Sequence, residues 1–483
     1  MAVSPVFIFL LCFLLSSPVF SSQIFLLPLS HSLSSSISDF NSTHNLLKST
    51  ATRSSARFHR HRHNHLSLPL SPGGDYTLSF NLGSESHKIS LYMDTGSDLV
   101  WFPCSPFECI LCEGKPKIQS PLPKISNNKS VSCSAAACSA AHGGSLSASH
   151  LCAISRCPLE SIEISECSSF SCPPFYYAYG DGSLVARLYR DSLSLPTPAP
   201  APSPPINVRN FTFGCAHTTL GEPVGVAGFG RGVLSMPSQL ATFSPQLGNR
   251  FSYCLVSHSF AADRVRRPSP LILGRYHTGE TEFIYTSLLE NPKHPYFYSV
   301  GLAGISVGNV RIPAPEFLRK VDESGSGGVV VDSGTTFTML PSGLYESVVA
   351  EFENRTGKVA NRARRIEENT GLSPCYYYQN SVGVPRVVLH FVGEKSSVVL
   401  PRKNYFYEFL DGGDGVVEVG RKRKVGCLML MNGGDEAELA GGPGATLGNY
   451  QQQGFEVVYD LEKNRVGFAR RQCSTLWDNL NRS

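Results

Sequence analysis

Two distant stretches of this chain end an apolar run with an aspartate, a hydroxyl-bearing residue and a glycine. The first reads KISLYMDTGSDLVW, residues 88–101, and the second reads VVVDSGTTFTML, residues 329–340. In the first, Asp94 is followed by Thr-Gly-Ser, and in the second, Asp332 is followed by Ser-Gly-Thr. A single triplet of this kind is usually an ordinary turn. Two copies with matching apolar lead-ins indicate two equivalent loops with a common purpose.

The residues after each aspartate suit a loop that holds a carboxylate in one orientation. Gly96 and Gly334 have no Cβ, so the chain can turn sharply at both positions. The hydroxyl groups of Ser97 and Thr335, one residue further on, can reach back to the carboxylates. We therefore expect each acid to be fixed by its own loop.

Two carboxylates that face each other could activate a water molecule. At a separation of about 3 Å they cannot both ionise, so they share one proton and titrate as a pair. The ionised group can take a proton from water while the protonated group polarises the carbonyl that the water attacks. If each copy of the loop belongs to one of two similar lobes, Asp94 and Asp332 would meet at the axis between them.

The elements that would position these loops are mainly strands. Apolar and polar residues alternate with period 2, which is typical of half-buried strands, in DYTLSFNLG, HKISLYMD, RNFTFGC, PLILG, YFYSVGLAGISVG, RVVLHF, SVVLP and GFEVVYD. Amphipathic helices are few, and the clearest are PSGLYESVVAEFEN and LSMPSQLA. The Pro-rich stretch at 195–205 cannot join a central strand and is interpreted as an exposed linker.

Composition excludes some classes of partner. The chain has 483 residues, 41% of them apolar and 17% charged, which is enough to bury a large core. A net charge of +4 is small for this length and gives no reason to expect nucleic acid or an anionic membrane as partner.

The N-terminal residues 1–22 are interpreted as a secretory signal, because an apolar run is followed by small residues near a plausible cleavage point. The run is shorter than the roughly 20 apolar residues that span a bilayer, and the C-terminal LWDNLNRS is polar. We expect no stable membrane insertion and a secreted protein.

The cysteines fit an oxidising compartment. Of fifteen, Cys12 lies in the expected signal, and nine of the other fourteen crowd between Cys104 and Cys172. Zinc binding is the rival interpretation for the CxxC at Cys109 and Cys112, but the other spacings repeat no zinc pattern, so disulfides and no metal are expected. Because nine is odd, at least one of these cysteines should pair outside the cluster or stay free. Glycosylation sequons stand at Asn128, Asn210 and Asn354.

Residues 23–70 are rich in Ser and His and contain the basic run RFHRHRHNH. Three interpretations stay open. The segment could be solvated and disordered, it could carry a zinc-binding His tract, or it could be a removable pro-segment. In the last case the basic part, Arg57 to His65, would lie against an acidic cleft and be released as carboxylates protonate at lower pH, which gives a zymogen.

Taken together, the motifs resemble the pepsin family of aspartic endopeptidases. The resemblance runs in order from about Gly74 to Cys473, through DTGSDLVWFPC, YGDGS, FTFGC, GVAGFGRGVLSMPSQL, FSYCL, VVVDSGTTFT and ATLGNYQQQGFEVVYDLEKNRVGF. The cysteine-rich insertion after the first motif is similar to the plant nepenthesin-like branch. Aspartic proteases are themselves the reference case for a proton-sharing carboxylate pair, so the chemistry above matches a known pattern.

The resemblance implies an all-β, bilobal fold with two pseudo-symmetric lobes, a few short helices and a central cleft. It implies the following layout: a signal at 1–22, a pro-segment at 23–70, an N-terminal lobe at 71–290 with the insertion at 104–172, and a C-terminal lobe at 291–483. It also implies a monomer that needs no cofactor and cleaves polypeptide substrates at acid pH. The plant branch implies the apoplast or cell wall as the location, with the vacuole as an alternative.

Roles of single residues follow from the same resemblance. Asp94 and Asp332 would be the catalytic pair, and Thr95 and Ser333 would brace the two loops across the lobe interface. The other expected substrate-site residues are the flap tyrosine and the residues of its turn and of the two loops, namely Tyr179, Asp181, Gly96, Gly334, Ser97 and Thr335. Val226-Ala227-Gly228 and Thr446-Leu447-Gly448 would pack behind the two loops.

The resemblance also pairs Cys375 with Cys427. Of Cys215, Cys254 and Cys473, two could then bridge each other and one could pair with the cluster. We therefore expect seven disulfides, no free thiol outside the signal, and one bridge from the insertion to a later part of the chain.

The chain departs from the family pattern after YGDGS. The nepenthesin-like branch usually continues with Thr and then Gly, whereas Val185 and Arg187 follow here, which puts flap motion and specificity in doubt. The alternative functions are a catalytically silent relative that binds or inhibits other proteins, such as glycoside hydrolases, and a wall protein that only binds in its cleft. Silent relatives commonly lack one catalytic aspartate or its glycine, and both are present here.

Overall fold

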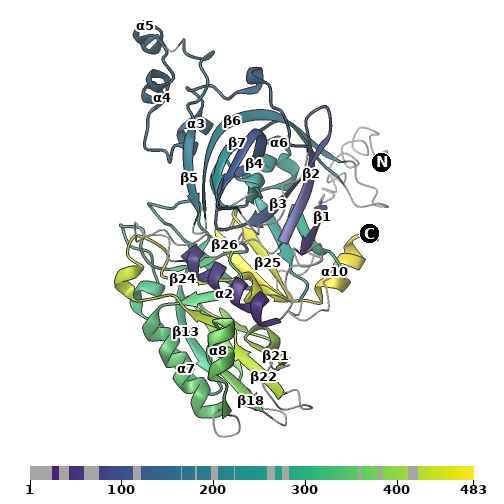
Figure 1. Cartoon of the computed structure of the whole chain (residues 1–483), viewed down its shortest axis with the longest axis vertical. Coiled ribbons are helices and arrows are strands. Elements are labelled where there is room, and N and C mark those ends of the chain that lie inside the picture. Colours follow the sequence, from purple (N-terminus) through teal and green to yellow (C-terminus); the bar gives the residue numbers. More distant parts are fainter. Residues whose placement is uncertain are drawn as a thin grey trace, which may run out of the picture.

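A computed structural model describes most of the chain, and Figure 1 shows its two lobes stacked along the long axis. The described residues are 24–31, 43–58, 76–112, 121–164, 166–179, 182–196, 205–221, 224–257, 267–274, 282–356, 361–378, 383–411 and 423–482. Four parts of the sequence analysis fall outside these ranges: the expected signal, Asp181, most of the basic run and most of the Pro-rich linker. None of the described helices combines the length and the apolar character needed to cross a membrane.

The N-terminal lobe is built on strands, several of which the alternation of apolar and polar residues predicts. They are β2 (Tyr76–Leu82), β3 (His87–Asp94), β4 (Val100–Ile110), β5 (Phe175–Tyr179), β6 (Gly182–Leu195), β7 (Ile206–Leu220) and β8 (Val226–Gly228). In β2 the side chains alternate between buried and half-buried along the whole strand. At the centre of this lobe, β3 runs parallel to β8 and places Asp94 opposite Gly228.

The C-terminal lobe repeats this central arrangement. Its short strands are β12 (Ser299–Val300), β15 (Val329–Val331), β16 (Thr338–Leu340), β23 (Leu430–Asn432) and β24 (Ala445–Leu447). β15 runs parallel to β24, as β3 does to β8, and β16 pairs with β23 and β24 as β4 pairs with β7 and β8. The two lobes are therefore pseudo-symmetric around the two aspartate loops.

Two further antiparallel sheets complete the C-terminal lobe. One has the order β14 (Val310–Pro313), β13 (Leu302–Val307), β19 (Val387–Phe391) and β20 (Ser397–Val399). The other has the order β17 (Asn361–Arg362), β18 (Cys375–Tyr378), β22 (Arg423–Leu428) and β21 (Phe406–Asp411).

An antiparallel sheet joins the two lobes. Its strands, in order, are β1 (Ile24–His31), β10 (Ser269–Gly274), β9 (Arg250–Cys254), β25 (Phe455–Asp460), β26 (Arg465–Arg470) and β11 (Ile284–Leu289). Strands from both ends of the chain meet here, and one continuous apolar core runs from the N-terminal lobe through this sheet into the C-terminal lobe. The mainly β, bilobal fold expected from the sequence is confirmed.

Both expected helices are present among the described helices. These are α2 (Thr43–Phe58), α3 (Ala136–Ala141), α4 (Ala148–Ile154), α5 (Leu159–Glu163), α6 (Met236–Phe243), α7 (Ser342–Thr356), α8 (Arg364–Thr370), α9 (Asn449–Gln452) and α10 (Cys473–Leu480). The side chain of Ser235 caps α6 by accepting a hydrogen bond from the Ser238 amide. In α7, Leu344, Val348 and Phe352 recur at four-residue spacing and are buried.

The segment before residue 70 is not simply solvated. β1 pairs with β10 along six residues and with β2 along two, and its Leu27 and Leu29 lie in the main core. α2 buries Leu47 and Ala51 against the C-terminal lobe. The expectation of a disordered stretch is therefore wrong for residues 24–31 and 43–58, because the apolar side chains of β1 are buried on both faces of the strand and those of α2 are covered by the C-terminal lobe.

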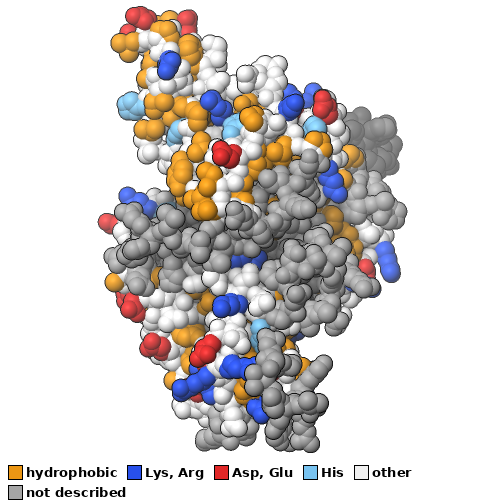
Figure 2. Space-filling view, viewed as in Figure 1, with side chains coloured by type: hydrophobic (Ala, Val, Ile, Leu, Met, Phe, Trp, Pro, Cys, Tyr) orange, Lys and Arg blue, Asp and Glu red, His pale blue; other side chains and the backbone are white. Residues whose placement is uncertain are grey.

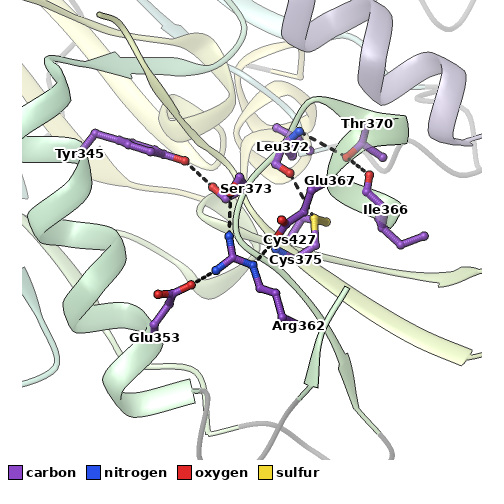
Figure 3. Close-up of polar contacts among 10 residues, drawn as sticks. All are labelled: Tyr345, Glu353, Arg362, Ile366, Glu367, Thr370, Leu372, Ser373, Cys375 and Cys427. Atoms are coloured by element: carbon purple, nitrogen blue, oxygen red, sulfur yellow. Dashed lines mark hydrogen bonds and ion pairs between the residues drawn. A yellow bond between two sulfur atoms is a disulfide. The ribbon is translucent and has the colours of Figure 1, made fainter. Parts of the chain in front are cut away.

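The surface under α2 is a braced platform of the C-terminal lobe. α2 packs on α8, and its Ala51 lies beside Gly371, which ends α8 in the left-handed conformation. Behind this contact, the guanidinium of Arg362 binds the carboxylates of Glu353 and Glu367 (Figure 3). Glu367 also accepts a hydrogen bond from the amide of Cys375, at 2.7 Å, next to the Cys375–Cys427 disulfide. These charge-assisted contacts fix the platform on which α2 rests.

The cysteine-rich insertion forms a separate arm on the N-terminal lobe. It carries α3, α4 and α5, which Figure 1 places at the far end of that lobe, and Figure 2 shows apolar side chains at its tip. Three disulfides lie within it, Cys133–Cys152, Cys138–Cys172 and Cys157–Cys167.

Four more bridges complete the set, Cys104–Cys215, Cys109–Cys112, Cys254–Cys473 and Cys375–Cys427. The seven expected disulfides are confirmed. They include the bridge from the cluster to a later strand, Cys104–Cys215, and the disulfide expected within the CxxC, Cys109–Cys112. The sequon residues Asn128, Asn210 and Asn354 are all exposed, and their glycosylation stays a prediction.

Candidate active site

Asp94 ends β3 and points into a loop that offers it two hydrogen bonds. The Gly96 amide donates to Oδ1 at 2.9 Å, and the Ser97 hydroxyl donates to Oδ2 at 2.7 Å. The residue is only 1% exposed. An acceptor-only carboxylate is thus held in one orientation by two donors from its own loop.

Asp332, the residue after β15, has the same surroundings in the other lobe. The Gly334 amide donates to Oδ1 at 2.8 Å, and the Thr335 hydroxyl donates to Oδ2 at 2.5 Å. Asp332 is 5% exposed. The two acids therefore have equivalent partners, atom by atom.

The loops are tied to each other across the lobe interface by reciprocal hydrogen bonds. The Ser333 amide donates to Oγ1 of Thr95 at 2.8 Å, and the Thr95 amide donates to Oγ of Ser333 at 3.1 Å. Each hydroxyl also donates to a carbonyl of the opposite lobe, Thr95 to Val331 at 3.0 Å and Ser333 to Met93 at 3.2 Å. All four bonds are buried, and each one joins one aspartate loop to the other.

The glycines let the two acids approach. A Cβ on Gly96 would lie 2.8 Å from both Cγ and Oδ1 of Asp332, so the Asp332 carboxyl group sits directly over the first loop. Behind the loops, a Cβ on Gly228 would lie 2.4 Å from the carbonyl carbon of Asp98, and one on Gly448 would lie 2.4 Å from the Thr336 oxygen. No larger residue could occupy these positions without moving backbone.

A buried chain of side chains lies beneath the loops, and sequence reasoning did not identify it. The hydroxyl of Tyr459 lies 2.9 Å from that of Tyr253, 3.4 Å from Oγ1 of Thr95 and 3.3 Å from the Val331 oxygen. Tyr253 donates to Oε1 of Gln452. The amide of Gln452 donates in turn to the Leu447 and Asp332 carbonyls, at 2.8 and 3.3 Å.

This network connects the interlobe sheet to both loops. Since the Gln452 amide nitrogen faces two carbonyls, its oxygen must accept the Tyr253 hydrogen, and the single Tyr459 hydrogen is shared among three neighbouring oxygens. The network was hidden in the sequence because FSYCL, QQQ and VVYD look like ordinary strand and turn residues, and nothing local shows that they meet.

The flap residues are placed only in part. Tyr179 ends β5 and pairs with Gly182 at the start of β6, which gives the expected hairpin, while Asp181 lies outside the described residues. Val185 and Arg187, the two departures from the family pattern, are both exposed on β6.

A third acid in the first loop, Asp98, has an unusual environment. Its Oδ2 accepts a hydrogen bond from the Leu234 amide at 3.3 Å, and its carboxyl group presses against Gly232. Although the residue is only half-buried as a whole, its Oδ1 is shielded from solvent and has no hydrogen-bond partner among the described residues. Burial raises the pKa of Asp98 to about 6, against the opposing effect of the Leu234 and Gly232 amides.

The groups that face Asp98 are buried as well. The pKa of Tyr298 is raised by burial and, to a smaller extent, by Asp98, and it is lowered by Arg231. The guanidinium of Arg231 pairs with Glu290 at 3.0 Å and reaches Asn464 at 3.3 Å. Asp98 follows Ser97 directly, so its charge state bears on the stability of the first loop. The only sequence signal for it is a second acid four residues after Asp94.

Replacing Asp98 by Asn should flatten the dependence of stability on pH. Because the folded protein holds the Asp98 proton more tightly than the unfolded chain does, the contribution of Asp98 to the free energy of unfolding is fully present below about pH 4 and is lost by about pH 6. The loss is at most about 3 kcal/mol, and less where solvent screens the charge. Thermal unfolding followed between about pH 4 and pH 7 should show a drop in Tm of several degrees in the wild type and a smaller one in Asp98→Asn.

Asp322→Asn is the matched control. Asp322 lies in an exposed turn, and hydrogen bonds from Ser324 and Ser326 lower its pKa, so its effect on stability has the opposite sign and falls below this pH range. The control should keep the wild-type slope. Equal slopes for the wild type and Asp98→Asn would show that Asp98 does not govern this pH response.

Comparison with known proteins agrees with the fold. Residues 76–275 match the family model described as "Xylanase inhibitor N-terminal", and residues 297–470 match "Xylanase inhibitor C-terminal". A probable aspartyl protease of Arabidopsis thaliana is 64% identical over 438 residues, covering 86% of this chain and 85% of the relative. Aspartic proteinase nepenthesin-1 of Nepenthes gracilis is 30% identical over 410 residues, covering 83% and 78%.

Two solved structures share the fold at low sequence identity. Basic 7S globulin from soybean has a TM-score of 0.60 at 18% identity and covers 94% of this chain and 99% of its own. The structure of edgp has a TM-score of 0.58 at 18% identity and covers 83% and 92%. With two family models that together span most of the described chain and a relative of 64% identity, this protein belongs to the pepsin-like family of aspartyl proteases, in its nepenthesin-like plant branch.

Proposed function

We propose that this protein is an active aspartic endopeptidase that hydrolyses polypeptides at acid pH, without a cofactor, as a secreted monomer. The observation that carries the proposal is the equivalence of the two acids. Asp94 and Asp332 are each held by a glycine amide and a hydroxyl from their own loops, and the loops are joined by reciprocal hydrogen bonds. A protein that used the cleft only for binding would have no need of matched carboxylates.

In the proposed reaction the two carboxyl groups share one proton and act on a water molecule between them. The ionised member takes a proton from the water, whose oxygen attacks the amide carbonyl carbon, while the other member gives its proton to the carbonyl oxygen. The tetrahedral intermediate then collapses. The carboxyl group that took the water proton gives it to the amide nitrogen, the other takes a proton back from a hydroxyl of the intermediate, and the C–N bond breaks to release an amine and a carboxylic acid. Ser97 and Thr335 hold the acids in position through both steps. Tyr179 and the hairpin around Asp181 would cover the bound peptide.

A catalytically silent binding protein is the second candidate. The specific observation in its favour is the description of the matching family models, which names xylanase inhibitors. An inhibitor of glycoside hydrolases would bind through its surface and would not need either acid. The experiment below separates the two functions.

Asp94→Asn and Asp332→Asn should each abolish hydrolysis while leaving the fold intact. Asn is nearly isosteric with Asp but cannot share the proton, so we expect a loss of at least about 10²–10⁴-fold. The measurement is cleavage of a denatured protein by the purified wild type and variants at acid pH, with and without pepstatin.

Near-normal turnover in either variant would contradict the proposed mechanism. A wild-type protein that folds, cleaves nothing and inhibits a xylanase equally well with and without the substitutions would support the binding function instead.

Tyr459→Phe should lower kcat with little change in KM. The substitution removes the hydroxyl that contacts Thr95 and Val331, so the two loops lose a buried support without losing a substrate contact. Tyr405→Phe is the matched control, because Tyr405 is equally buried and donates its hydroxyl hydrogen to the Pro385 carbonyl in the C-terminal lobe. Each variant should lose about 1–3 kcal/mol of stability, but only Tyr459→Phe should lose turnover. Equal kcat values in the two variants would assign Tyr459 a purely structural role.

We also propose that residues 23–70 are an inhibitory pro-segment. Support comes from the position of α2, whose Ser54 hydroxyl accepts a hydrogen bond at 3.1 Å from the amide of Phe337, five residues after Asp332. His44 of α2 lies 3.8 Å from Asp411. The hypothesis that Arg57 to His65 meet an acidic cleft concerns residues outside those whose side chains the structure describes.

Removal of the whole segment would take β1 out of the interlobe sheet. Phe25, Leu27 and Leu29 would leave the core, and the edge of β10 would be exposed. The sequence offers a substitute, because Leu-Pro-Leu-Ser at 27–30 recurs at 68–71. A cut upstream of Leu66 would leave this second copy at the new N-terminus, where it could replace β1.

Acid incubation should therefore give an N-terminus between Arg57 and Leu66, read by N-terminal sequencing of the active protein. Leu47→Asp should speed this release, because it places a charge at a fully buried helix position. Lys48→Asp, one residue away on the exposed side, is the control. A fully active protein that begins at Gln23 would count decisively against the pro-segment.

A further inference from the structure

The arm formed by the cysteine-rich insertion exposes an unusual amount of apolar surface. Among the described residues, six large apolar side chains are more than half exposed, and three of them lie within eleven residues at the tip of the arm. These three are Ile154 at 57%, Leu159 at 67% and Ile164 at 63%. Ala153 and Pro158 beside them are also exposed. We call these five residues the tip patch, and contiguous apolar exposure of this kind marks interaction surfaces.

The tip patch is mounted rigidly. Cys133–Cys152 holds the end of α4, and Cys157–Cys167 brackets α5. The four sulfur-bearing side chains are buried and form a small core with Ile162 and Phe170. The apolar side chains of the tip patch take no part in that core, so their exposure is not needed to fold the arm. A rigid surface also loses little conformational entropy when it binds.

Acidic side chains surround the tip patch. Glu160, Glu163 and Glu166 are all exposed around α5, and Arg156 is the one basic residue, among those described, between residues 150 and 170 apart from His150. Figure 2 shows red side chains at the edge of the orange tip. The surface is therefore apolar at its centre and negative at its rim, which favours a partner that is apolar and positively charged.

We infer that the tip patch is a docking site for a polypeptide segment that carries lysine or arginine beside apolar residues, and that it recruits protein substrates. The arm leads directly into β5, the first strand of the flap hairpin, through Cys172, so a captured chain would be held on the flap side of the N-terminal lobe. The recruiting role rests on the proposed protease function, whereas docking itself does not.

A membrane surface fits the same patch less well. Anionic lipid head groups would be repelled by the three glutamates, and a negative rim offers nothing to them. A polypeptide can place cations over the rim and apolar side chains over the centre at the same time. We therefore argue for the polypeptide and treat lipid binding as an outcome that would overturn the proposal.

Docking is tested without catalysis, on the full-length Asp94→Asn variant. Fluorescence anisotropy compares three labelled peptides of equal length, in which Leu alternates with Lys, with Glu or with Ser. The Lys-Leu peptide should bind at least about tenfold more tightly than the other two, as expected for a few apolar and charged contacts. Its affinity should fall as salt is raised, because the rim charges are exposed to solvent.

Two variants of the arm separate the apolar centre from the acidic rim. The first variant should lose the tenfold preference for the Lys-Leu peptide, and it combines Ile154→Ser, Leu159→Ser and Ile164→Ser. The second should bind that peptide with an affinity that no longer depends on salt, and it combines Glu160→Gln, Glu163→Gln and Glu166→Gln. The matched control replaces three exposed apolar residues of the C-terminal lobe, Val310, Val399 and Leu410, by Ser, and it should bind as the parent does.

Recruitment is tested in the active protein with one cleavable peptide that ends in either the Lys-Leu or the Ser-Leu tail. The Lys-Leu tail should lower KM several-fold without changing kcat, and the serine variant of the tip should lose that advantage. Equal binding of all three peptides, an unchanged preference in the serine variant, or binding to phosphatidylserine vesicles in place of the peptide would overturn the docking site. If nothing is cleaved but the Lys-Leu peptide still binds at the tip, docking stands and the protease function fails.

Discussion

The whole arrangement depends on holding two buried carboxyl groups, those of Asp94 and Asp332, close together. Such a pair is costly, because like charges repel and burial disfavours ionisation. Thr95 and Ser333 meet this cost by joining the loops through four buried hydrogen bonds that cross the lobe interface. Since each bond spans the interface, the lobes cannot separate at this point without losing all four.

The symmetry of the strands follows from the same constraint. Each acid needs a parallel strand pair that ends at its loop, and β3 with β8 and β15 with β24 supply equivalent pairs. The interlobe sheet then fixes the position of one strand pair relative to the other. Hydrogen bonds of Tyr253, Tyr459 and Gln452 connect this sheet to the two loops above it. The C-terminal strands β25 and β26 are thus part of the framework that holds the two aspartate loops.

Much of this could be predicted from the sequence. The strands could be predicted from the period-2 runs, because alternation of apolar and polar residues is a local property. The two aspartate motifs predicted the loops and the hydroxyl groups that hold the carboxylates. The odd number of cysteines in the cluster meant that at least one of them had to pair outside it or stay free, and the Cys104–Cys215 disulfide shows that one pairs outside. The roles of Asp94, Asp332 and Tyr179 remain predictions that need the experiments above.

What could not be predicted depends on contacts between distant residues. β1 has too weak a pattern to reveal that it completes a sheet whose other strands lie more than 200 residues away. Asp98 looks like one more turn residue in the sequence, and only the approach of Gly232 and Leu234 isolates its carboxyl group.

The tip patch lies in a stretch with few large apolar residues, and the disulfides explain how those few can stay exposed. Where cross-links hold the backbone, apolar side chains are not needed for a core, and they are left available for binding. The central framework has the opposite character, because its side chains are committed to one another. Recognition in this protein is therefore best sought at the disulfide-braced periphery, and chemistry at the buried interface.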